Sequence, residues 1–228
     1  MVPKEYYGRL FTKEQLPVDY HSEASILESM IKVDKQLRCK RCYSQIEEDW
    51  QLPEDQYYCR ACIVFGRNQE GKELYYFPSK TSEIEFPVLK WLGELTPYQD
   101  EVSEKLLETY KKQKDSLVHA VTGAGKTEMI YKIVAYVLEN KGRVAIASPR
   151  VDVCRELFLR MQGDFTCSIS LLHAESEPYD GSPLVIATTH QLLKFYQNFD
   201  LVIVDEVDAF PFVGNVMLNH AVEQAKKE

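Results

Sequence analysis

Long apolar stretches are missing from this 228-residue chain. No run of uncharged apolar residues approaches the roughly 20 that a membrane-spanning helix needs, and the N-terminal MVPKEYYGRL lacks the apolar core of a signal peptide. Internal repeats and low-complexity tracts are also missing, which excludes repeat architectures and argues against a disordered chain. The sequence therefore predicts a globular protein that works in the cytoplasm.

Positive charge is in short supply. The 27 Lys and Arg residues face 35 Asp and Glu residues, which gives a formal net charge of -8. That balance argues against a nucleic-acid-binding protein, because phosphate binding relies on Lys and Arg. Local distribution matters more than the sum, however, and residues 32–41 (KVDKQLRCKR) are basic within an otherwise acidic chain. The length allows one medium domain and a smaller one.

Cysteines are few, but four of the six are arranged in pairs. Two Cys-x-x-Cys pairs, separated by sixteen residues, consist of Cys39, Cys42, Cys59 and Cys62. In a reducing compartment this pattern indicates a metal rather than disulfides, and the spacing suits one tetrahedral Zn²⁺ held by two knuckles. Iron in a rubredoxin-like site, or a redox dithiol, is the alternative. The remaining two, Cys154 and Cys167, are predicted to be buried apolar residues.

Basic and aromatic residues surround these cysteines. Lys40, Arg41 and Arg60 would offset the negative charge of a zinc–thiolate centre or contact DNA phosphates, and both roles can hold together. The rings could stack on bases, but a small metal domain also needs rings to fill its core, and core packing is preferred for most of them. They are Tyr43, Tyr57, Tyr58, Tyr75, Tyr76 and Phe77.

Three segments are predicted along the chain. Residues 1–35 form an N-terminal segment with a short amphipathic helix at 23–33, and residues 36–85 form a four-cysteine module. Residues 91–228 alternate helices with strands that are apolar throughout, as in a parallel sheet covered on both faces. The strands are expected at 117–121, 143–148, 168–173, 183–189 and 201–206, and helices at 97–110, 126–140, 151–161 and 190–196. This pattern predicts a doubly wound α/β domain.

The stretch HAVTGAGKTEM, residues 119–129, lies between a predicted strand and a predicted helix, as a phosphate-binding loop does. Gly123 and Gly125 let backbone N–H groups turn toward a polyphosphate, and the helix N-terminus adds partial positive charge. Lys126 would reach the β- and γ-phosphates, and Thr127 would bind Mg²⁺. The usual first glycine is replaced by Ala120, and a glycine turn with an incidental lysine is the bland alternative.

An acidic pair follows the last predicted strand. LVIVDE, residues 201–206, has four apolar residues before Asp205 and Glu206. A carboxylate at the end of a buried strand holds Mg²⁺ in ATPases of this type, and a second one orients the attacking water. Asp205 is therefore predicted to bind magnesium and Glu206 to orient water. The alternative is that Asp205 caps a turn.

Three motifs resemble superfamily 2 helicases of the DEAD/DEAH type: AVTGAGKT (120–127), DEVD (205–208) and LTPYQ (95–99). The resemblance accounts for Ala120, and it implies a RecA-like fold and ATP with Mg²⁺ as the cofactor. Gln99 would read the adenine edge, and catalysis would depend on Lys126, Asp205 and Glu206. The implied nucleotide-binding residues are Gln99, Thr122, Gly123, Ala124, Gly125, Lys126 and Thr127.

Two further stretches resemble helicase segments that contact the backbone of one nucleic-acid strand. ASPRVDVCREL (147–157) is similar to motif Ia, and IATTHQLLKF (186–195) to the Ib/Ic region. Arg150 would equally well cap its helix or pair with an acid. The predicted DNA contacts are Arg150, Thr188, Thr189 and His190, together with Lys40 and Arg41 of the four-cysteine module.

The order of four cysteines, LTPYQ, AVTGAGKTEM and DEVDAFPF is similar to the ComFA family of late competence ATPases. That resemblance implies the N-terminal half of an ATP-dependent translocase or helicase, acting on single-stranded DNA during uptake in natural transformation. Expected partners are single-stranded DNA and competence proteins of the membrane channel and cytosol. The expected location is the cytoplasm, with peripheral attachment at the inner face of the membrane as a further expectation.

Family members continue through a third motif and a second RecA-like domain that carries an arginine finger. This sequence stops at Glu228, about 20 residues after DEVD, so we expect a piece cut before motif III that binds and hydrolyses nucleotide poorly. One alternative is a non-catalytic, zinc-dependent adaptor that binds DNA or a partner through a nucleotide-sensing fold. Another is a primosomal replication-restart helicase, although its zinc insertion lies in the C-terminal half.

Overall fold

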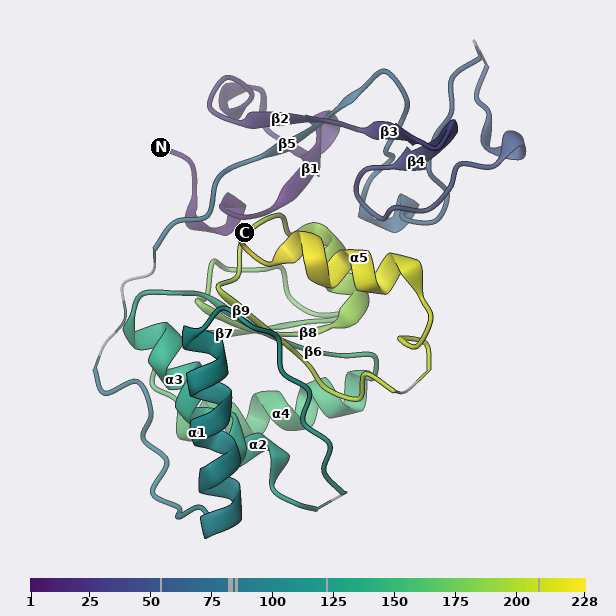
Figure 1. Cartoon of the computed structure of the whole chain (residues 1–228). Helices are drawn as coiled ribbons and strands as arrows, with labels where there is room; N and C mark the ends of the chain where they lie inside the picture. Colours follow the sequence, from purple (N-terminus) through teal and green to yellow (C-terminus); the bar gives the residue numbers. More distant parts are fainter. Residues whose placement is uncertain (54, 82–83, 85, 122, 209) are drawn as a thin grey trace.

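A four-stranded parallel sheet forms the centre of the larger domain (Figure 1). The computed structural model describes residues 1–53, 55–81, 84, 86–121, 123–208 and 210–228. In sheet order β7-β8-β6-β9, the strands are Ile169–Leu172, Leu184–Thr188, Val144–Ser148 and Leu201–Val204. The two central strands, β8 and β6, are buried along their whole length. Such strands belong inside a sheet covered on both faces, so the predicted α/β domain is confirmed.

Alternate residues of these strands enter two separate cores. Ala145 and Val185 face a core built with α5 (Val216–Ala225) and the 3-10 helix η6 (Thr189–Lys194). Ile146 and Ile186 face one built with α3 (Tyr131–Glu139) and α4 (Val151–Asp164). Figure 1 shows α5 on one side of the sheet and α3 and α4 on the other. The helices are α1 (Pro97–Lys111), α2 (Lys126–Met129), α3 (Tyr131–Glu139), α4 (Val151–Asp164), α5 (Val216–Ala225) and η6 (Thr189–Lys194). The domain is doubly wound, as predicted.

One predicted strand is wrong. Residues 117–121 form no strand, and the side chains of Leu117 and Val121 are 80% and 76% exposed. An apolar segment becomes a strand only when a neighbouring strand accepts its hydrogen bonds. Within the described chain, β9 pairs only with β6, and nothing pairs with 117–121. The predicted helix at 126–140 is also divided at Ile130 into α2 and α3.

The N-terminal part consists of short antiparallel strands. The N-terminal sheet has the order β1-β5-β2, and β3 and β4 form a hairpin that leads into the first cysteine pair. The strands are β1 (Leu10–Thr12), β2 (Ser25–Glu28), β3 (Met30–Val33), β4 (Gln36–Cys39) and β5 (Glu73–Tyr76). Short 3-10 helices lie between them: η1 (Lys4–Tyr6), η2 (Lys13–Gln15), η3 (Val18–Tyr20), η4 (Glu48–Trp50) and η5 (Ile63–Phe65).

The helix predicted at 23–33 is wrong, because β2 and β3 occupy that range and pair with β5 and β4. Burial alternates along β2, which is the strand period rather than the helical one. The division into residues 1–35, 36–85 and 91–228 stays a prediction. β5 joins residues 73–76 of the four-cysteine module to the N-terminal segment in one sheet.

The N-terminal part lies directly against the larger domain. Gly8, whose φ is +71°, leaves no room for a Cβ beside the side chain of Asn198, and its carbonyl accepts a 2.9 Å hydrogen bond from the N–H of Tyr196. Further along, the rings of Tyr43 and His220 stack with centroids 5.1 Å apart. The two parts therefore share a packed boundary. Among the described residues, no helix has the length and apolarity to cross a membrane.

Candidate functional site

The predicted phosphate loop is held by the start of α1. Thr96 caps this helix, and Gln99 completes a capping box through its Oε1, which accepts from the N–H of Thr96 at 2.8 Å. The Nε2 of the same Gln99 donates to the carbonyl of Ala124 at 2.9 Å. One side chain thus fixes both the helix start and the loop. The structure places Gln99 beside the loop, and its role in reading adenine stays a prediction.

The loop itself requires two glycines. Gly123 and Gly125 have φ values of +80° and +72°, in the left-handed region where a Cβ is strained. A Cβ on Gly125 would also overlap the Nε2 of Gln99. Lys126 and Thr127 then open α2, and Lys126 is exposed and makes no ion pair with any described residue. Thr122, a predicted nucleotide-binding residue, lies outside the described residues.

The acidic pair follows β9 as predicted. The N–H of Asp205 donates to the carbonyl of Ala147 at 2.8 Å, which extends the β6–β9 pairing. Its Oδ1 accepts from the N–H of Glu206 at 3.0 Å, a local contact of the kind expected if Asp205 caps a turn. The backbone of Glu206 is left-handed, with a φ of +56°. No hydrogen bond or ion pair joins the described residues of 119–127 to Asp205 or Glu206, and the magnesium and water roles stay predictions.

Arg150 is bound by acids. Its guanidinium contacts Asp152 at 2.6 Å and Glu206 at 3.7 Å. Hydrogen bonding to Asp152 raises the pKa of Arg150, and the charge of Glu206 adds to the effect. The alternative that Arg150 pairs with an acid is thus seen in the structure. Because the side chain is exposed, it can exchange these partners for a phosphate.

The Ib/Ic segment is more buried than its predicted role requires. Thr189 is 0% exposed and Thr188 is 8% exposed. The side chain of Thr189 therefore offers no surface to a phosphate in this structure. His190, at the second position of η6, is half-buried, and burial lowers the pKa of its imidazole.

The four cysteines converge, as their spacing predicts. All four are buried, and their Sγ atoms lie within 4.8 Å of one another. The Sγ pairs Cys39–Cys62 and Cys42–Cys59 are 3.7 and 3.5 Å apart. Four thiolates around Zn²⁺ with Zn–S bonds of about 2.3 Å would be separated by about 3.8 Å. The geometry of the cluster therefore fits a tetrahedral metal ion.

The surroundings of the cluster fit the same ion. Hydrogen bonds from the other thiols hold the pKa of Cys39 well below its usual value, whereas hydrogen bonding with Cys39 raises the pKa of Cys62. The Nδ2 of Asn68 donates to the Sγ of Cys39 at 3.1 Å, a contact that orients metal ligands. A divalent cation would stabilise all four thiolates together.

The basic residues of the module have structural partners. Arg41 is 1% exposed, and its Nη1 donates to the carbonyls of Phe65 and Gly66 at 2.6 and 3.0 Å. Its predicted DNA contact is therefore corrected: the buried guanidinium supports η5 beside the thiolates. Lys40 is half-buried, and its carbonyl contacts the Nε2 of His220 at 3.1 Å. Arg60 pairs with Asp49 at 3.1 Å.

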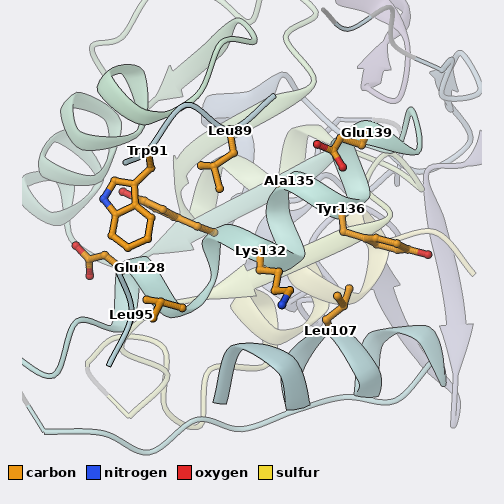
Figure 2. A pocket seen from close by; sticks show the side chains of 10 residues that line it. Leu89, Trp91, Leu95, Leu107, Glu128, Lys132, Ala135, Tyr136 and Glu139 are labelled. Carbon is orange, nitrogen blue, oxygen red and sulfur yellow. The ribbon is translucent and has the colours of Figure 1, made fainter. Parts of the chain in front are cut away.

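A mostly apolar cavity of about 420 Å³, which the sequence did not indicate, is lined by residues of α1, α3 and the segment that precedes α1. Figure 2 shows Trp91 at one side and Tyr136 of α3 at the other, with Leu89 above, Lys132 of α3 in the centre and Leu107 of α1 below. The ring of Trp91 meets that of Tyr131 edge to face, with centroids 5.5 Å apart. Single aromatic residues give no sequence signal for a cavity, because its walls come from three separate segments.

A family described as type III restriction enzyme, res subunit, matches residues 92–213. The chain belongs to this helicase family. Membership accounts for the parallel sheet and identifies the α/β domain as RecA-like. It also supports ATP with Mg²⁺ as the cofactor and nucleic acid as the ligand.

Competence proteins are among the similar sequences. The chain is 57% identical over 227 residues to competence protein ComFA of Streptococcus pneumoniae, covering 98% of this chain and 52% of that protein. It is 36% identical over 209 residues to ComFA of Bacillus subtilis, covering 88% and 45% respectively. The resemblance to ComFA predicted from the motifs is confirmed. The chain spans about half the length of these curated relatives.

Two weaker similarities involve a replication restart protein and a restriction-modification enzyme. Replication restart protein PriA of Bacillus subtilis is 26% identical over 125 residues, covering 49% of this chain and 16% of that protein. A solved structure of the type ISP restriction-modification enzyme LlaGI, a nuclease-deletion mutant with a DNA substrate mimic, gives a TM-score of 0.33 at 17% identity. It covers 49% of this chain and 12% of that one.

Proposed function

We propose that this chain is the N-terminal half of an ATP-dependent translocase that drives single-stranded DNA into the cell during natural transformation. The observation that carries the proposal is the identity to ComFA, which extends over 98% of the chain and so includes the four-cysteine module. A helicase-family domain alone would suit many motors. By the same similarity, the protein acts in the cytoplasm beside the membrane channel, together with competence proteins and single-stranded DNA.

In the nucleotide site, the backbone at Gly123 and Gly125 cradles the phosphates and Lys126 binds them as a point charge. ATP with Mg²⁺ supplies the phosphoryl group and the charge that polarises it. Thr127 and Asp205 hold the magnesium, while Glu206 orients a water molecule. The contact between Arg150 and Glu206 supports a link between the nucleotide and DNA sites, because Arg150 cannot hold a phosphate and both acids at once.

In the four-cysteine module, Cys39, Cys42, Cys59 and Cys62 hold one Zn²⁺. The fit of their Sγ distances to a tetrahedral ion supports this assignment. The ion joins the β3–β4 hairpin to η5. It therefore stabilises the module.

The DNA site is assigned to the exposed Arg150, the half-buried His190 and the mostly buried Thr188 of the two predicted segments. Arg150, Thr188 and His190 would follow the backbone of one strand, with Lys40 as a contact from the four-cysteine module. Phosphate contacts of this kind are independent of sequence. That independence suits a motor that must move along any DNA.

ATP hydrolysis tests the proposal. It should be measured with and without single-stranded DNA, for this chain and for a version extended to the full length of its relatives, each with a Lys126→Ala control. We expect DNA-stimulated hydrolysis by the extended protein, loss of that activity in the control, and little activity from this chain. An extended protein that binds DNA without hydrolysing ATP in its presence would overturn the motor assignment.

A non-catalytic adaptor is the second candidate. The observation that favours it is that the described residues of the predicted phosphate loop make no hydrogen bond or ion pair with Asp205 or Glu206. In this second reading, the fold would bind nucleotide as a switch without hydrolysing it. The adaptor would bind DNA or a protein through the four-cysteine module, and the hydrolysis experiment separates the two candidates. The similarity to PriA gives a replication-restart helicase less support, at 26% identity over half the chain.

A further inference from the structure

Two basic residues meet where the N-terminal sheet contacts the larger domain. Arg9 directly precedes β1, and its backbone forms an antiparallel bridge with Phe195. Lys194, the last residue of η6, is the neighbour of Phe195. The hydrogen bond from Tyr196 to Gly8 fixes the same two segments. The two cationic side chains are thus brought to one seam by backbone contacts between parts far apart in the sequence.

Both side chains lie on aromatic rings. The guanidinium carbon of Arg9 is 4.8 Å from the ring centroid of Phe11, and the Nζ of Lys194 is 5.7 Å from that of Phe65. Each residue is half-buried, so part of its hydration is lost. The rings recover some of this cost through cation–π attraction, but they do not neutralise either charge.

Neither cation has a carboxylate partner. No ion pair in the described chain involves Arg9 or Lys194. Arg9 makes one long hydrogen bond, from Nη1 to the carbonyl of Glu5 at 3.5 Å, and its Nε is buried without a partner. Burial is the main cause that lowers the pKa of Lys194, and the charge of Arg9 lowers it further. Two like charges in a partly desolvated seam repel each other, and an anion between them would relieve the repulsion.

The position of the pair suggests which anion this is. η6 carries His190 and ends at Lys194, four residues later. At about 2.0 Å per residue in a 3-10 helix, these positions are roughly 8 Å apart. Successive phosphates of one strand rise about 3.4 Å along the axis of B-DNA and lie farther apart along the backbone itself, so one strand can bridge these two positions. A strand that passes His190 can therefore reach Lys194 and then Arg9.

We propose that Arg9 and Lys194 form a binding site for one phosphodiester of single-stranded DNA, which carries the strand from η6 onto the N-terminal sheet. The site rests on the proposed function, since it lengthens the DNA path assigned there. It would make the N-terminal part a contributor to the DNA track as well as a support for the fold.

Salt dependence of DNA affinity tests the site. The full chain should be compared with Arg9→Gln, Lys194→Gln and the double variant, by anisotropy of a labelled oligonucleotide of mixed sequence over a range of salt concentrations. Each phosphate contact to a single strand contributes about 0.7 to the slope of log K against log salt. We expect the double variant to lose about 0.7 of slope. Lys194→Arg, which keeps the charge, should retain the wild-type slope.

The matched control is Lys105→Gln with Lys112→Gln. Both lysines are exposed, Lys105 on α1 and Lys112 at its C-terminal cap, and they pair with Glu101 and Glu108. The double variant removes the same net charge. Its slope should equal that of the wild type. Thermal melting and zinc content show whether every variant is folded. If Arg9→Gln unfolds, the salt slope of Lys194→Gln alone tests the site.

Two outcomes would overturn the site. If wild type binds DNA and the folded double variant has the same slope, the pair is only structural and the proposed function stands. If wild type binds no single-stranded DNA at low salt, the proposed function fails and the site fails with it. A slope loss shared equally by the α1 control would also overturn the site, because it would reflect net charge alone.

Discussion

The side-chain amide of Gln99 donates to the carbonyl of Ala124 across 2.9 Å while its oxygen accepts from the N–H of Thr96. A single residue therefore closes the first turn of α1 and holds the phosphate loop against it. The two functions use opposite ends of the amide. They can be separated by a substitution that keeps the acceptor and removes the donor.

Gln99→Glu is that substitution. Glutamate also completes a capping box, so we expect the thermal stability of the protein to change little. The loop should lose one hydrogen bond, worth about 1 kcal/mol, and face a negative charge close to the nucleotide phosphates. Affinity for a fluorescent ATP analogue should fall by roughly tenfold. Gln113→Glu, at an exposed position after α1, is the control, and equal losses in both variants would contradict the prediction.

The two loop glycines offer a matched pair. Gly123 and Gly125 share a left-handed backbone, so Gly→Ala costs about 1–2 kcal/mol of strain at each. Only at Gly125 does the new methyl group also meet Gln99, whereas nothing lies within 4 Å of a Cβ on Gly123. Gly125→Ala should therefore weaken binding of the ATP analogue more than Gly123→Ala does. The same ranking is expected in thermal melting, and the reverse ranking would show that the contact with Gln99 is unimportant.

Zinc retention tests the four-cysteine cluster. Cys39→Ser removes one ligand and should release the metal and unfold the module, because binding free energy is folding free energy in such domains. Cys167→Ser, at a cysteine outside the cluster, should retain one zinc per chain. Metal content by atomic emission and far-UV circular dichroism measure both effects. A folded, monodisperse Cys39→Ser protein without metal would contradict the assignment.

Asn68 gives a milder test of the same site. Asn68→Ala leaves all four thiolates but removes the N–H donor to Cys39. Loss of such an outer contact typically weakens metal binding by about 10–100-fold. Competition with a chromogenic chelator should show zinc leaving this variant at lower chelator concentration than wild type. Asn219→Ala, on α5, where the side chain bonds only to the carbonyl of Asn215, is the control.

The parts of the fold that the sequence predicts correctly are those with a local signal. β6, β8 and β9 are continuous apolar runs, which predict buried strands. Thr96 and Gln99 form a capping box, which predicts the start of α1. Residues 117–121 have the same apolar pattern, yet they form no strand because pairing depends on a neighbour that sequence pattern cannot supply. The helix predicted at 23–33 was wrong because β2, within this segment, pairs with β5, whose residues lie about fifty positions later in the chain. A local pattern cannot indicate such a distant partner.

The candidate site divides in the same way. Spacing predicted the convergence of four cysteines, since each pair is local and the ion would join the pairs. Spacing could not predict that Arg41 is buried while the adjacent Lys40 remains half-exposed, because that difference depends on where η5 packs. The pair Arg9 and Lys194 carries no motif, and only the backbone bridge across the seam brings the two together.

Acidification should weaken the fold through His190. Burial lowers the pKa of its imidazole in the native state, whereas the unfolded chain has a value near 6.5. The unfolded state therefore binds more protons in this range, so the free energy of unfolding rises with pH, and stability is lost as the pH falls through about 6.5. Denaturant unfolding at pH 7.5 and 5.5 measures the loss. His190→Gln should reduce it, while the exposed His119→Gln should behave as wild type does, including any loss from zinc release. Equal pH dependence in the two variants would show that the imidazole of His190 is not desolvated enough to affect stability.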